Sequence, residues 1–167
     1  MLIKKLFPEE KRDVYLKWIL IGLLIRLSLM PFTVHGDIIG INWLARGLVY
    51  HGYVPVKRMD YPPLVYFTAF FFQRVFKPAM PLFGQWWDAT QPWFIGPHVG
   101  RYLFLLKSYY LIFDLGIAFL LLRLIVDNQK RLLAFKLWMT NPVVILVCYM
   151  HGQYDIVPTF FVWKTGR

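Results

Sequence analysis

The sequence predicts an all-α, multi-pass transmembrane protein. Of its 167 residues, 58% are hydrophobic and 17% are charged, whereas an average soluble domain has about 25% charged residues. Three apolar segments, residues 14–34, 102–126 and 132–150, are candidates to cross a bilayer, because a membrane-spanning helix needs roughly 20 mostly apolar residues. We therefore expect one membrane module with three complete spans.

The basic residues indicate how these spans are oriented. They gather in the tail 1–13 and in the short link between the second and third spans. By the positive-inside rule both stretches are cytosolic, and residues 35–101 form an external or lumenal loop. The net charge of +10 thus sets orientation, and we expect no nucleic-acid partner. The single cysteine, Cys148, allows no internal disulfide, and no metal site is recognisable.

The long external loop contains two further helix patterns. Residues 38–50 place apolar side chains near one face and predict a helix on the membrane surface. Residues 63–76 are rich in Phe and Tyr and too short for an ordinary span, which favours an interfacial or re-entrant helix. If this piece did cross, Asp37 and Asp155 would lie on opposite sides. Residues 77–100 predict an irregular loop near the headgroups.

The chain ends soon after a fourth apolar run begins. Residues 156–167 hold only a short apolar stretch before a polar end, so we expect the start of a fourth span. The sequence then reads as the front part of a larger protein, or as a reading frame that ends early.

Three acidic residues stand at expected junctions between helix and loop on the external face. Asp37 is either the N-cap of the following helix, a general base, or both. Asp60 precedes two prolines and is either a turn cap or a substrate contact. Asp155 closes the polar string His151-Gly152-Gln153-Tyr154-Asp155, which interrupts an apolar run and favours a functional site.

Two charged residues lie inside predicted spans at similar depth. Arg26 of the first span and Asp114 of the second are expected to form a structural ion pair, because an unpaired charge in hydrocarbon is costly. Lys107 lies nearer the external end, where its amine could snorkel to the interface or reach a phosphate.

Three strings in order carry a family resemblance: Gly36-Asp37, Asp60-Tyr61-Pro62-Pro63-Leu64, and Asn141-Pro142 leading to His151-Gly152-Gln153-Tyr154-Asp155. They resemble the GT-C superfamily of membrane glycosyltransferases, whose relevant members use dolichyl- or polyprenyl-phosphate sugars as glucosyl or mannosyl donors. The likeness covers only the N-terminal part of such an enzyme. Asp37 corresponds by position to the acid implicated there as catalytic base.

The resemblance implies an inverting hexosyltransferase. It would act on a lipid-phosphate-linked sugar and a glycan or lipid-linked acceptor at the external face, in the plasma membrane of a prokaryote or the endoplasmic reticulum of a eukaryote. One carboxylate suffices as base, and cations or amide donors are needed to receive the leaving phosphate. No cofactor is expected, and the sequence has no nucleotide-binding glycine loop or Asp-x-Asp motif. The residues expected to contact substrate are Asp60, Tyr61, His151, Gln153, Asp155, Arg101 and Lys107.

A different class of function also fits the sequence. The acids could serve as caps and ion pairs in a non-enzymatic multi-pass protein, either a transporter fragment or a structural subunit. An inactive fragment of a glycosyltransferase is a third possibility. The enzyme requires Asp37, Asp60 and Asp155 on one face, whereas a transporter favours ionisable groups near the midplane.

Overall fold

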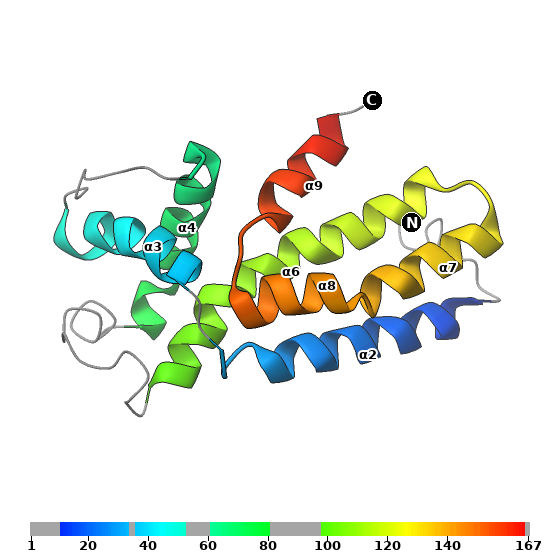
Figure 1. The fold of residues 1–167 in the computed structure, drawn as a ribbon, viewed down its shortest axis with the longest axis horizontal. Helices are drawn as coiled ribbons and strands as arrows, with labels where there is room; N and C mark the ends of the chain where they lie inside the picture. Colours follow the sequence, from blue (N-terminus) through cyan, green and yellow to red (C-terminus); the bar gives the residue numbers. More distant parts are fainter. Residues whose placement is uncertain (1–10, 34–35, 53–60, 81–97, 166–167) are drawn as a thin grey trace.

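The fold is all-helical throughout the part that the structure describes. A computed structural model of the chain describes residues 11–33, 36–52, 61–80 and 98–165. The expectations for most of the tail 1–13, for Asp60 and for most of the loop 77–100 fall outside these ranges. Helices α2 (Arg12–Leu29), α6 (Val99–Leu124) and α7 (Asn128–Met139) lie side by side along the long axis of the molecule (Figure 1).

Among the described residues, two helices are long and apolar enough to cross a membrane. They are α6 and the continuous stretch Asn128–His151 that begins with α7. Helix α2 is shorter than the expected segment 14–34, because it ends at Leu29 just before Pro31, and proline removes a backbone donor and breaks a helix. It also carries Lys17 and Arg26, so its crossing stays a prediction.

The stretch Asn128–His151 is not one regular helix. After α7 the chain turns at Thr140 and Asn141, then continues through α8 (Pro142–Val144) and the π-helical segment η4 (Ile145–His151). The expected single span 132–150 is therefore interrupted, because Pro142 lacks the N–H that would continue the α7 ladder. Asn141 caps the new start by accepting from the Val143 amide at 2.9 Å.

The helices expected in the external loop form a hairpin at one end of the long helices (Figure 1). Helix α3 (Gly36–Arg46) runs on as the π-helical segment η2 (Gly47–His51), and α4 (Pro63–Phe76) has the bounds expected for the second helix. Pro63 occupies the first turn of α4, where its missing N–H costs nothing. The hairpin core contains Ala45 and Ala69, whose small side chains let the two backbones approach.

Three helical segments begin or finish at the end of the molecule where this hairpin lies. Helix α2 finishes there, α6 begins there, and η4 ends there, next to α3 (Figure 1). The opposite end holds the start of α2 and the link between α6 and α7, where the basic clusters lie in the sequence. A short helix, α9 (Ile156–Thr165), packs on α6 where the expected fourth apolar run begins.

Candidate functional site

The first site residue, Asp37, lies in the first turn of α3. Its carboxylate oxygen Oδ1 accepts a hydrogen bond from the Tyr61 hydroxyl at 2.8 Å. Asp37 was expected just before the helix, whereas α3 already begins at Gly36. The side chain is half-buried, so the carboxylate is held by a neighbour while part of it remains open.

Tyr61 links the second sequence string to the third. Its ring meets the ring of Tyr154 edge to face, with centroids 4.8 Å apart, and that of Tyr66 at 6.0 Å. Edge-to-face aromatic pairs stabilise an arrangement by about 0.5–1.5 kcal/mol beyond area burial. Asp37, Tyr61 and Tyr154 therefore form one connected group drawn from all three strings.

A left-handed glycine brings the third string against α3. Gly152 ends η4 with φ +74°, a conformation that favours glycine. Its carbonyl accepts from the buried Tyr110 hydroxyl at 2.9 Å, and a Cβ added to it would lie 3.1 Å from Ile38 Cβ. The turn at Gly152 thus fixes where the residue after Asp37 packs.

The electrostatics of this group keep its phenols protonated. Burial first, and then the hydrogen bond to Asp37, raise the pKa of Tyr61 well above its usual value. The pKa of Tyr154 is also raised, by burial and then by the charges of Asp155 and Asp37. The carboxylates of Asp37 and Asp155 therefore both raise the pKa of Tyr154. The Tyr61 hydroxyl stays protonated and remains a donor to Asp37 at neutral pH.

The rest of the third string is more open. Asp155 is exposed, and its backbone carbonyl accepts from Thr159 through both the amide and the hydroxyl. Its side chain lines a cavity of about 140 Å³. His151 is exposed as well, and Gln153 is half-buried, with its backbone N–H donating to the Val147 carbonyl at 3.0 Å.

The two cations expected to reach a phosphate differ in exposure. Arg101 is exposed in the first turn of α6. Lys107 is fully buried, and its ammonium donates to the carbonyl and hydroxyl of Thr33 and to the Tyr149 carbonyl. Those three acceptors match its three donors. The expected phosphate contact of Lys107 thus finds no support, because this side chain joins the ends of α2 and η4.

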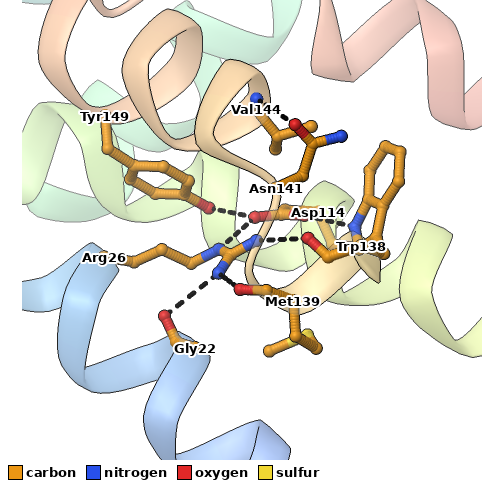
Figure 2. Close-up of polar contacts among 8 residues, drawn as sticks. All are labelled: Gly22, Arg26, Asp114, Trp138, Met139, Asn141, Val144 and Tyr149. Carbon is orange, nitrogen blue, oxygen red and sulfur yellow. Dashed lines mark hydrogen bonds and ion pairs between the residues drawn. The ribbon is translucent and has the colours of Figure 1, made fainter. Parts of the chain in front are cut away.

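Arg26 and Asp114 form the ion pair expected from the sequence. Arg26 Nε lies 2.6 Å from Asp114 Oδ2, and both side chains are almost completely buried. The carboxylate also accepts from the Trp138 indole and the Tyr149 hydroxyl, each at 2.7 Å (Figure 2). Each oxygen of Asp114 therefore has a partner within the protein.

The guanidinium of Arg26 also donates hydrogen bonds to backbone carbonyls, including two at the end of α7. It donates to the carbonyls of Met139 at 2.6 Å and Trp138 at 3.3 Å, and to that of Gly22 at 3.1 Å (Figure 2). The last carbonyls of a helix have no partner within it. Arg26 therefore completes the end of α7 at the break before Pro142.

Sequence reasoning missed the aromatic members of these groups. Tyr154 was not singled out within its string, and neither Trp138 nor Tyr149 was expected beside Asp114. The available signal was a polar aromatic near a helix break, since buried Tyr and Trp need a hydrogen-bond partner. Within the described residues, no group of three or more His, Cys, Asp or Glu side chains could hold a metal ion.

The arrangement offers a carboxylate that can accept a proton, positioned by a neutral phenol and bordered by aromatic rings. Asp60, expected beside it, lies outside the described residues. Comparison of the chain with protein-family models, with curated proteins and with solved structures found no match.

Proposed function

We propose that this chain carries the base-bearing part of a membrane hexosyltransferase, with Asp37 as general base. The observation that supports the proposal is the hydrogen bond from Tyr61 to Asp37 at 2.8 Å, together with the Tyr61–Tyr154 ring contact. Three strings chosen from their order in the sequence thereby meet in space. Structural caps would not require residues so far apart in the chain to converge.

The proposed reaction is a single displacement that inverts the sugar. Asp37 takes the proton of the acceptor hydroxyl as its oxygen forms a bond to the anomeric carbon. The bond from that carbon to the donor phosphate breaks, and the polyprenyl or dolichyl phosphate leaves with the electron pair. The exposed Arg101 and His151 are the side chains proposed to donate hydrogen bonds to that phosphate, and aromatic faces at Tyr61 and Tyr154 suit a sugar ring.

The proposed setting is a multi-pass arrangement in which α2, α6 and the stretch Asn128–His151 all cross the membrane. Asp37 and Asp155 then belong to the same external or lumenal end. That end faces outward from the plasma membrane in a prokaryote, or into the endoplasmic reticulum in a eukaryote. The basic ends of the spans lie in the cytosol.

The direct test is sugar transfer in proteoliposomes that contain the full chain. Labelled polyprenyl-phosphate glucose and mannose are supplied in separate reactions with a lipid-linked glycan acceptor. Asp37→Asn should lower turnover by at least about 100-fold, the lower range for loss of a general base. Asp127→Asn changes a carboxylate that caps α7 at the opposite end and should leave turnover unchanged. The same reactions are run with a longer version of the protein that includes this chain, and equal turnover with and without Asp37→Asn there would refute the proposal.

A non-enzymatic membrane protein is the second candidate, and Asp114 favours it. This acid is enclosed by Arg26, Trp138 and Tyr149, so it acts as a structural group. Cysteines placed at positions 37 and 155 discriminate between the candidates. Labelling of both from the same side agrees with the enzyme, whereas labelling from opposite sides rules out a shared site.

A further inference from the structure

An apolar groove lies between the two helices of the external hairpin. Its volume is about 250 Å³, and its walls include Leu44, Ala45 and Leu48 on one side and Tyr66, Phe67 and Phe70 of α4 on the other. These walls present carbon surface almost throughout. Replacing water by hydrocarbon in a groove of this kind lowers the free energy.

The groove borders an exposed apolar stripe on α4. Leu64, Phe67, Phe71 and Val75 follow each other at helical spacing and are 39%, 69%, 60% and 54% exposed. Phe67 belongs to both the groove and the stripe. Large exposed apolar rings in a row mark a surface that contacts another apolar phase, and here the groove and stripe form one continuous face.

The position of α4 shows which apolar phase lies nearby. Phe72 stacks on Tyr109 of α6 with ring centroids 5.2 Å apart, and α6 is one of the two helices long and apolar enough to cross a membrane. The hairpin is therefore attached to the side of a candidate span. Because the hairpin lies at one end of the long helices (Figure 1), a bilayer crossed by α6 would place it near the level where acyl chains meet headgroups.

A cation completes the surface. Arg74 is exposed in the last turn of α4, one residue before Val75 of the stripe. Arginine beside an apolar face keeps its aliphatic stem on the hydrocarbon and its guanidinium at the phosphate level, where it attracts anionic lipid.

We infer that the groove between α3 and α4 binds an acyl chain of an anionic bilayer phospholipid, whose phosphate lies at Arg74. The hairpin is thereby fixed to the membrane surface by a bound lipid as well as by its stripe. This inference does not depend on the proposed transferase activity, since it concerns a different surface and a different ligand.

Photo-crosslinking in vesicles tests this site. The full chain is reconstituted in phosphatidylcholine with a minor share of phosphatidylglycerol that carries a photoactivatable group on one acyl chain. Crosslinked residues are then mapped by mass spectrometry. We expect crosslinks at Leu44, Leu48 and Phe70. Leu48→Trp, which fills the groove, should lower their yield about tenfold, equivalent to roughly 1.4 kcal/mol. Leu16→Trp, at a leucine of α2 with 45% exposure against 38% for Leu48, should leave the yield unchanged.

A second pair of variants tests the headgroup and remains informative if Leu48→Trp fails to fold. Arg74→Gln should remove the preference for phosphatidylglycerol over a phosphatidylcholine probe with the same label, whereas Arg123→Gln at the far end of α6 should retain it. Equal groove yields from both probes in the unmodified chain would overturn the inference. So would complete displacement of the phosphatidylglycerol probe by polyprenyl phosphate at a far lower mole fraction, because the occupant would then be the carrier lipid.

Discussion

The Tyr61 hydroxyl donates to Asp37 Oδ1 across 2.8 Å and 24 residues of sequence. This one bond joins the first turn of α3 to the residues that start α4, and so it sets the orientation of the carboxylate proposed as base. The effect of this hydrogen bond on the Asp37 carboxylate should be measurable separately from its effect on stability.

Tyr61→Phe keeps the ring contact with Tyr154 and removes only the hydrogen bond. We expect the free energy of unfolding in detergent to fall by about 1 kcal/mol, which is seen as a slightly lower melting temperature. Sugar transfer should fall about tenfold in kcat with KM nearly unchanged, because Asp37 loses its positioning partner. Tyr66→Phe is the matched control, and an equal loss in both variants would argue against a positioning role for Tyr61.

The ion pair between Arg26 and Asp114 predicts non-additive stability. Arg26→Leu or Asp114→Leu alone leaves a buried charge without its partner and should cost about 3–5 kcal/mol. The double variant should recover part of this loss, because no isolated charge remains. Unfolding in mixed micelles measures all three, and strictly additive losses would show that the pair is not coupled.

Gly22 lies where α2 packs closely against the end of α7. A Cβ added there would lie 2.5 Å from Met139 Cε and 2.9 Å from the Met139 carbonyl oxygen. Because that second atom belongs to the backbone, Gly22→Ala should cost about 1–3 kcal/mol through overpacking. Gly36→Ala meets nothing within 4 Å and serves as control. Equal stability of the two variants in detergent would contradict this packing.

The two left-handed glycines separate backbone strain from close packing. Gly52 and Gly152 have φ of +72° and +74°, but only Gly152 has a neighbour, with Ile38 Cβ 3.1 Å from an added Cβ. Each alanine variant should lose about 1–2 kcal/mol from strain. Gly152→Ala should in addition lower sugar transfer, because Ile38 follows the proposed base. Equal sugar transfer by Gly52→Ala and Gly152→Ala would show that the turn at Gly152 has no role in the proposed site.

Tyr50 predicts a stability change at alkaline pH. Its hydroxyl donates to the Met80 carbonyl at 2.9 Å, and burial raises its pKa from 10.0 to about 12. A group with a raised folded pKa adds stability that is present in full below its unfolded pKa and lost as pH rises toward the folded one. Melting temperatures should therefore fall between pH 10 and about 12 more steeply in the unmodified chain than in Tyr50→Phe. Parallel curves would contradict the assignment.

Features with a local cause were accessible from the sequence. The start of α4 follows from Pro62 and Pro63, and the pairing of Arg26 with Asp114 follows from their similar depth in apolar runs. Both depend on rules that act within one helix or on the cost of charge in hydrocarbon. The helical class follows from composition and span length in the same way.

Features that depend on tertiary contacts were not accessible. Lys107 was expected at a phosphate, yet its acceptors come from Thr33 and Tyr149, and the ends of two other helices had to be placed before that contact could be foreseen. The break in the third span was also missed. Pro142 signals a break locally, but whether a buried break is tolerated depends on Arg26, which is remote in sequence.

In the proposed membrane setting, the interruption before Pro142 also bears on how the chain is inserted. The Met139 carbonyl at this break receives its donor from Arg26, whereas the Trp138 carbonyl also accepts from the Asn141 amide, so residues 128–151 alone would leave the Met139 carbonyl unsatisfied, which is costly in lipid. Arg26 and Asp114 both precede this segment and emerge first from the ribosome. In that setting we expect the order of synthesis to matter: the earlier helices should already be present when the last one is inserted, and a version with α2 moved to the C-terminus should integrate its broken helix poorly.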